Sequence, residues 1–171
     1  WLAKTGEPIS AALRDEYRAI WASLIGNLAP IDECLVLRDY HVDNLMVIDN
    51  EQGLDACGLL DFQDGLIGST AYDMVSLFED ARRDVDQQMA ADIKANYLKG
   101  RSPQYVQDFE NWYAVLGAHR HVKVLGIFVR LCLRDNKAHY LDFVPHVQMM
   151  LERSLNKPQL APLKAFFDAH H

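Results

Sequence analysis

The sequence predicts a mainly helical α+β domain that contains one small β-hairpin. Apolar residues recur at helical spacing before residue 30 and again after residue 70. Between these regions, two short apolar runs flank the polar segment 49–53, whose Asp, Asn and Gly residues are typical of a turn. The chain has 171 residues, half of them hydrophobic, which is enough for one domain with a hydrophobic core.

Charge and cysteine content narrow the class of protein. The net charge of −7 argues against a nucleic-acid-binding surface. No apolar run reaches the length of a membrane span, and no basic-then-apolar signal segment opens the sequence. The three cysteines, Cys34, Cys57 and Cys132, are odd in number and lack C-x-x-C spacing. We therefore expect a reduced cytoplasmic protein without a zinc site.

The first predicted element is a helix over residues 1 to about 30. Ser10 is a suitable N-cap, and Pro30 is expected to end the helix. The apolar residues at helical spacing, expected to face the core, are Leu13, Tyr17, Ile20, Trp21, Leu24 and Ile25.

The segment from Leu35 to Asp64 holds the candidate site. Asn44 precedes the first apolar run and Asp61 ends the second, so a hairpin between the runs places these two residues side by side. Asp39 lies five residues before Asn44 and can reach the same space from the loop. Two carboxylates and one amide suit Mg²⁺, which is held by few carboxylates and leaves room for substrate phosphates.

Helices follow the hairpin. Thr70 and Asp73 resemble a capping box at the start of a helix, and the charged run from Glu79 to Asp86 is expected to be a solvated face. Gly100 is expected to end a further helix. Three prolines are predicted to open later helices: Pro103 after Ser102, Pro145 and Pro162.

The site segment carries a family resemblance. Asp39-x4-Asn44 followed by Asp61-Phe62 resembles the catalytic loop and metal-binding Asp of protein kinases, H-R-D-x4-N and D-F-G. Residues 68–73, GSTAYD, resemble the segment that follows the metal Asp in the aminoglycoside phosphotransferase superfamily. There are two departures: Leu37 stands where these families have His, and Gln63 stands where protein kinases have Gly, which argues against a protein kinase.

Within that superfamily, residues 37–45, 59–64 and 116–128 resemble the bacterial N-acetylmuramate/N-acetylglucosamine anomeric kinases of cell-wall recycling. This resemblance implies a protein-kinase-like fold of which residues 1–171 form the C-terminal lobe, with the catalytic loop and the substrate site. No glycine-rich nucleotide motif occurs in the sequence, so we expect the ATP-covering N-terminal lobe to be absent from this chain.

The resemblance also implies roles for single residues. Asp39 is expected to accept or orient the proton of the acceptor hydroxyl, and Asn44 and Asp61 are expected to hold Mg²⁺ and, through it, ATP as co-substrate. Residues expected to support the site or the substrate are Arg38, His41, Asp43, Asp64 and Asp73. Asp73 is expected to bind the loop backbone near Arg38.

The expected substrate is a small sugar, phosphorylated on its anomeric hydroxyl, with no nucleic-acid or membrane partner. The surface that meets the N-terminal lobe in such a fold is expected to be partly apolar, which favours self-association of this chain. Two other interpretations remain open. One is an antibiotic kinase whose acidic cleft binds a cationic aminoglycoside, and the other is a non-catalytic binding or assembly domain.

Overall fold

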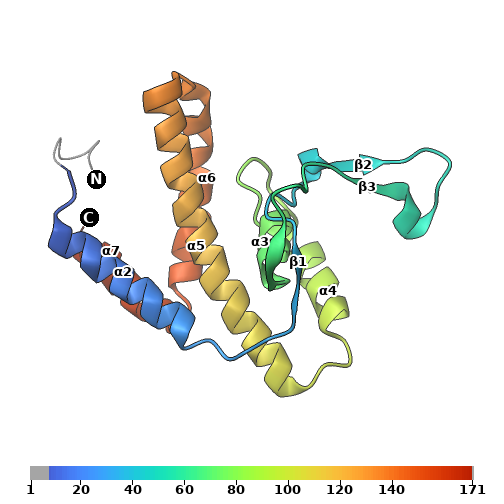
Figure 1. Ribbon diagram of the computed structural model, residues 1–171, viewed down its shortest axis with the longest axis horizontal. Coiled ribbons are helices and arrows are strands. Elements are labelled where there is room, and N and C mark those ends of the chain that lie inside the picture. The colour runs from blue at the N-terminus through green and yellow to red at the C-terminus, as the bar shows by residue number, and fades with distance from the viewer. Residues whose placement is uncertain (1–7, 171) are drawn as a thin grey trace.

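The computed structural model of the protein describes residues 8–170 and confirms a mainly helical α+β fold with small antiparallel sheets (Figure 1). The helices are α2 (Ala11–Gly26), α3 (Ala71–Phe78), α4 (Gln87–Leu98), α5 (Pro103–Asp135), α6 (Val144–Leu155) and α7 (Ala161–Ala169). The strands are β1 (Glu33–Val36), β2 (Leu45–Val47), β3 (Cys57–Leu59) and β4 (Leu66–Ser69).

The predicted hairpin is present. Strands β2 and β3 pair antiparallel, with Leu45 opposite Leu59 and Val47 opposite Cys57. Figure 1 shows this hairpin projecting away from the helices. A second antiparallel pair, β1 with β4, places Val36 opposite Leu66 and frames the candidate site from the other side.

Helix α5 is the central element. It runs 33 residues without interruption, which corresponds to about 50 Å at 1.5 Å per residue. Ser102 caps its start by accepting a hydrogen bond from the Tyr105 N–H, as the Ser102-Pro103 pair predicts. Asn136 ends it in a left-handed conformation, at φ 54°.

Three hydrophobic clusters pack on α5, one of them around Phe128 of α5 and Val147 of α6. The first joins α5 to α2, α6 and α7 around Trp21, Ala118 and Leu163. The second joins α5 to α3 and α4 around Val75 and Phe109, both fully buried. Helix α3 is thereby held rigidly against α5, and α3 is the helix that carries Asp73.

The first helix is shorter than predicted. Ser10 caps it as expected by accepting a hydrogen bond from the Leu13 N–H, but the helix ends at Gly26, before Pro30. The predicted portion from residue 1 to 7 lies outside the described residues.

Two further predictions are wrong. Thr70 makes no capping bond to α3; its hydroxyl accepts a hydrogen bond from Tyr97 instead. The run from Glu79 to Asp86 is not simply a solvated face, because Asp80 is 2% exposed and the Glu79 side chain is 14% exposed. The buried His121 on α5 pairs with Glu79, and Arg82 on the following turn pairs with Asp80.

None of the helices in residues 8–170 combines the length and the apolar character needed to cross a membrane.

Candidate functional site

The loop of residues 37–44, between β1 and β2, is held from below by Asp73 at the start of α3. The carboxylate of Asp73 accepts hydrogen bonds from the backbone N–H of Leu37, at 2.7 Å, and of Arg38, at 3.0 Å. The contact expected for Asp73 is therefore present. Burial raises the pKa of Asp73, while the two backbone donors and the nearby charge of Arg120 oppose this effect.

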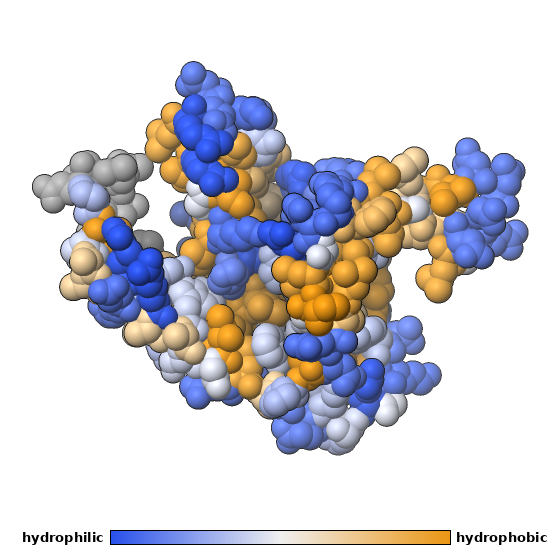
Figure 2. Space-filling view, in the orientation of Figure 1, coloured by the Kyte–Doolittle hydropathy of each residue, from blue (hydrophilic) through white to orange (hydrophobic). Residues whose placement is uncertain are grey.

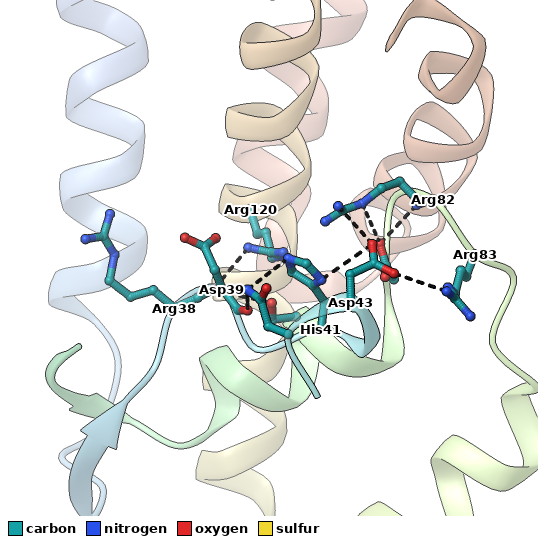
Figure 3. A network of polar contacts seen from close by, with 10 residues as sticks. Arg38, Asp39, His41, Asp43, Arg82, Arg83 and Arg120 are labelled. Atoms are coloured by element: carbon teal, nitrogen blue, oxygen red, sulfur yellow. Dashed lines mark hydrogen bonds and ion pairs between the residues drawn. The ribbon is translucent and has the colours of Figure 1, made fainter. Parts of the chain in front are cut away.

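Two more side chains fix the same turn. The hydroxyl of Ser76 and the guanidinium of Arg120 both donate to the backbone carbonyl of Arg38, at 3.3 and 3.5 Å. Both residues are buried. Figure 3 shows Arg120 reaching the loop from α5, behind Asp39. The position of Asp39, which is itself exposed, is thus set by buried groups on α3 and α5.

Asn44 is oriented by the loop around it. Its side-chain nitrogen donates to the backbone carbonyl of Asp39 at 2.9 Å and lies 3.4 Å from Nε2 of His41. His41 is 8% exposed, and desolvation, followed by the charge of Arg82, lowers its pKa. A neutral imidazole can accept at Nε2. Both N–H groups of the Asn44 amide then have acceptors, which leaves its oxygen available to a cation.

Asp61 lies two residues after the end of β3. The Leu60 N–H donates to the backbone carbonyl of Asn44 at 2.9 Å, which continues the hairpin pairing up to the residue before Asp61. Asp61 itself has a left-handed backbone, at φ 55°, and its carboxylate accepts a hydrogen bond from the side chain of Gln63 at 2.6 Å. Asp61 is exposed, so a ligand can reach it.

Asp43 takes a different direction. Its carboxylate forms ion pairs with Arg82 at 3.2 Å and Arg83 at 3.1 Å, and it lies 4.0 Å from His41 (Figure 3). Arg82 also contacts the buried Asp80. These contacts connect the loop to the turn after α3, so the Asp43 carboxylate is engaged by two arginines.

Asp64 meets the loop through its backbone only. Its carbonyl accepts a hydrogen bond from the Arg38 guanidinium at 3.3 Å, while its side chain is exposed. The structure therefore gathers Asp39, His41 and Asn44 in one loop, and the hairpin pairs Asn44 with Leu60, the residue before Asp61.

Sequence reasoning missed the supporting residues Ser76, Arg82 and Arg120. The charged run around Arg82 was a visible signal, but Ser76 and Arg120 are single residues on helices. Nothing in their local sequence indicates that they face a loop more than thirty residues away.

A metal site here rests on few ligands. Residues 8–170 contain no group of three or more His, Cys, Asp and Glu side chains placed to hold a metal. The predicted set is smaller: the carboxylate of Asp61 and the free amide oxygen of Asn44, with Asp39 nearby. Such a set fits Mg²⁺, which keeps several water and phosphate ligands, and does not fit a metal that needs a full protein cage.

A pocket of about 960 Å³ lies beside the loop. Arg38, Tyr72 and Lys123 contribute polar groups to its wall, and Trp112 and Leu116 from α5 contribute apolar ones. Its volume is typical of pockets for small organic ligands.

The supported loop, the hairpin that follows it and the adjoining pocket agree with the kinase-like resemblance of the sequence. Residues 2–125 match the model of the "Phosphotransferase enzyme family", and the chain belongs to this family.

Three bacterial relatives are named N-acetylmuramate/N-acetylglucosamine kinase. The chain is 37% identical to the protein from Caulobacter vibrioides over 160 residues, which cover 94% of this chain and 44% of the relative. It is 35% identical to the protein from Neisseria meningitidis serogroup B, over 86% of this chain and 46% of the relative. For the protein from Pseudomonas putida the identity is 31%, over 92% and 48%. The chain thus spans less than half the length of these relatives.

Proposed function

We propose that this chain carries the catalytic loop and the acceptor site of an ATP-dependent sugar kinase that phosphorylates N-acetylmuramate and N-acetylglucosamine. The observation that carries the proposal is the exposed Asp39 on a loop whose backbone is bound by Asp73, Ser76 and Arg120. Asn44 is bound to the Asp39 carbonyl, and the hairpin pairs Asn44 with Leu60, the residue before Asp61. The names of the relatives supply the substrate class.

In the proposed reaction, the oxygen of the acceptor hydroxyl bonds to the γ-phosphorus of ATP while the bond from that phosphorus to the ADP oxygen breaks. Asp39 accepts the hydroxyl proton and orients the attacking oxygen. The products are ADP and a sugar phosphate. The resemblance to anomeric kinases makes the anomeric hydroxyl the expected acceptor and a sugar 1-phosphate the expected product.

Asn44 and Asp61 are the proposed ligands of Mg²⁺, which when bound neutralises charge on the ATP phosphates. The Asn44 amide fits this task because its nitrogen is already engaged by the Asp39 carbonyl and lies beside His41. Asp61 fits it because its side chain is exposed and it directly follows Leu60, which pairs with the backbone of Asn44.

We propose that these residues act in a longer protein, together with a part that covers the nucleotide. The matched segment is less than half the length of the relatives, which leaves enough residues in them for such a part. On this proposal residues 1–171 form a single C-terminal lobe. Exposed apolar side chains on the hairpin and on β4, namely Val47, Leu54 and Ile67, support an apolar surface between the two parts. Figure 2 shows apolar residues along the projecting hairpin. The same surface favours self-association of this chain when it is alone.

The three cysteines are unpaired, which supports a reducing compartment, and we propose the cytoplasm.

An aminoglycoside is the second candidate acceptor, and the pocket disfavours it. Aminoglycosides are cationic, whereas the pocket wall carries Arg38 and Lys123 against the single carboxylate of Glu33. A non-catalytic assembly domain gives no reason for an exposed Asp39 on a loop that Asp73, Ser76 and Arg120 all bind.

A phosphorylation screen of the full-length protein tests this proposal. The protein is incubated with Mg·ATP and either N-acetylmuramate, N-acetylglucosamine or an aminoglycoside, and the phosphorylated position is determined by NMR. We expect a sugar 1-phosphate from both amino sugars and no product from the aminoglycoside. Phosphorylation of the aminoglycoside alone would contradict the proposed substrate class.

A further inference from the structure

The pocket beside the catalytic loop has a charge opposite to that of the protein. The chain carries a net charge of −7, yet two cationic side chains, Arg38 and Lys123, line this pocket with only one acidic residue, Glu33. Desolvation and the charge of Lys123 lower the pKa of His119, which also lines the pocket, so His119 is neutral at pH 7.

Neither cation has a carboxylate partner among residues 8–170. The ammonium of Lys123 lies 3.4 Å from the hydroxyl of Tyr72, and the guanidinium of Arg38 donates to the backbone carbonyl of Asp64. Two other lysines, in contrast, form ion pairs: Lys94 with Glu110 and Lys164 with Asp168. The unpaired charges of Arg38 and Lys123 are therefore available to an anion that enters the pocket.

The backbone of Arg38 adds a second observation. Its φ of 71° is left-handed, a conformation that a residue with a side chain adopts at a cost and glycine adopts freely. The loop thus places an arginine where glycine fits the backbone better. Strain at such a position points to a function of the side chain. The Arg38 side chain extends away from the loop (Figure 3) and lines the pocket.

The rest of the wall suits a sugar. Trp112 and Leu116 present apolar surface from α5, and the indole N–H of Trp112 donates to the Ala29 carbonyl at 2.8 Å, which fixes its ring. Apolar ring faces pack against the C–H faces of a pyranose, while the cations take a charged substituent.

We propose that Lys123, with Arg38, binds the carboxylate of an acidic amino sugar and so selects N-acetylmuramate over N-acetylglucosamine. The two sugars differ at one position: N-acetylmuramate carries a lactyl ether with a carboxylate where N-acetylglucosamine carries a hydroxyl. This inference rests on the proposed function and adds the residues that discriminate between its two substrates.

Binding to the full-length protein tests this inference without requiring turnover. Calorimetry compares N-acetylmuramate with its methyl ester, which has the same shape and no charge. We expect the acid to bind roughly ten- to a hundredfold tighter than the ester, as for loss of a charged hydrogen bond. Lys123→Met keeps the length of the apolar stem and should abolish most of this difference, whereas Lys123→Arg should retain it.

Lys137→Met is the matched control, because Lys137 is exposed and follows the end of α5, about 18 Å along the helix axis from Lys123. It should leave the preference for the acid unchanged. In steady-state assays, Lys123→Met should lower kcat/KM for N-acetylmuramate and leave that for N-acetylglucosamine and the KM for ATP within about twofold.

Three results overturn the inference. The first is equal affinity for the acid and the ester. The second is an equal fall of kcat/KM for both sugars in Lys123→Met, and the third is a raised KM for ATP in this variant with an unchanged sugar preference. The last result would assign the cations to a phosphate of the nucleotide. If the unaltered protein binds the acid selectively but phosphorylates neither sugar, the proposed function fails and the carboxylate site stands.

Discussion

The two segments that carry the candidate site are held in different ways. The loop of residues 37–44 is fixed by three side chains: the partly buried Asp73 accepts two backbone N–H bonds, and the buried Ser76 and Arg120 donate to the Arg38 carbonyl. The segment that begins at Asp61 is exposed through residue 64. Two hydrogen bonds that involve side chains hold this segment. The Gln63 amide donates to the Asp61 carboxylate, and the Arg38 guanidinium donates to the backbone carbonyl of Asp64.

This difference suggests that the two segments have different roles in the reaction. The base, Asp39, is placed before any substrate arrives, which lowers the cost of reorganising the site during reaction. Asp61 stands at the end of a projecting, weakly packed hairpin, where a segment opens at low free energy. We therefore expect the proton-accepting side of the site to be rigid and the metal-binding side to adjust when Mg·ATP binds.

The largest expected effect follows from the base. Asp39→Asn in the full-length protein keeps the size of the side chain and removes its ability to accept a proton. We expect kcat to fall by roughly 10²- to 10⁴-fold, with little change in the free energy of unfolding, because Asp39 is exposed. Steady-state kinetics and urea denaturation measure both quantities. A kcat within a few fold of the unaltered protein would show that Asp39 is not the base.

The second effect tests the rigid side. Asp73→Asn turns one of two acceptor oxygens into a donor that faces the N–H of Leu37 or Arg38. We expect the free energy of unfolding to fall by about 1–3 kcal/mol, together with a loss of kcat. The matched control is Asp86→Asn: Asp86 accepts a single bond, from the Met89 N–H at the start of α4. Since Asn caps helices as well as Asp does, the control should cost less than about 0.5 kcal/mol.

Equal losses of unfolding free energy for Asp73→Asn and Asp86→Asn would show that the loop does not depend on Asp73. The proposed difference between a rigid loop and an adjustable hairpin end would then lose its main support.

The smallest effect concerns the scaffold under the loop. Glu79 pairs with the buried His121 on α5, with 2.9 Å between Oε2 and Nε2. Burial by itself raises the pKa of Glu79, but the hydrogen bond and charge of His121, with smaller help from Tyr113 and Lys157, leave that pKa lowered.

A carboxyl with a lowered pKa in the folded state stabilises the fold above the pKa it has in the unfolded chain, about 4.3. This contribution is lost as the pH falls through the lowered value. We expect Glu79→Gln to be less stable than the unaltered protein at pH 7, by roughly 1 kcal/mol, and the gap to shrink as the pH falls below about 4. Urea denaturation across this range measures the gap, and a gap that widens on acidification would contradict the assignment.

Local sequence patterns were sufficient for the hairpin and most helix starts. The turn residues between β2 and β3 are adjacent in sequence to the strands that they join, and Ser10 and Ser102 act on N–H groups three residues away. The pairing of Asn44 with Leu60 follows from the same hairpin, whereas a shared metal site of Asn44 and Asp61 stays a prediction.

The missed features depend on contacts between distant residues. Strands β1 and β4 are separated by about thirty residues, including the whole loop and hairpin, and no turn signal joins them. The burial of Asp80 and Glu79 depends on Arg82 and His121, so a charged run looked solvated. The capping-box pattern at Thr70 failed because Asp73 binds the loop instead of the start of its own helix.

A crystal structure of the full-length protein with Mg²⁺ and a non-hydrolysable ATP analogue, compared with the free protein, tests the central claim most directly. We predict Mg²⁺ within about 2.0–2.2 Å of an Asp61 carboxylate oxygen and of the Asn44 amide oxygen. We also predict a shift of the hairpin and of residue 61, with the loop of residues 37–44 unchanged. A Mg²⁺ ion bound without Asn44 and Asp61, or a loop rebuilt around Asp39 on binding, would contradict the account.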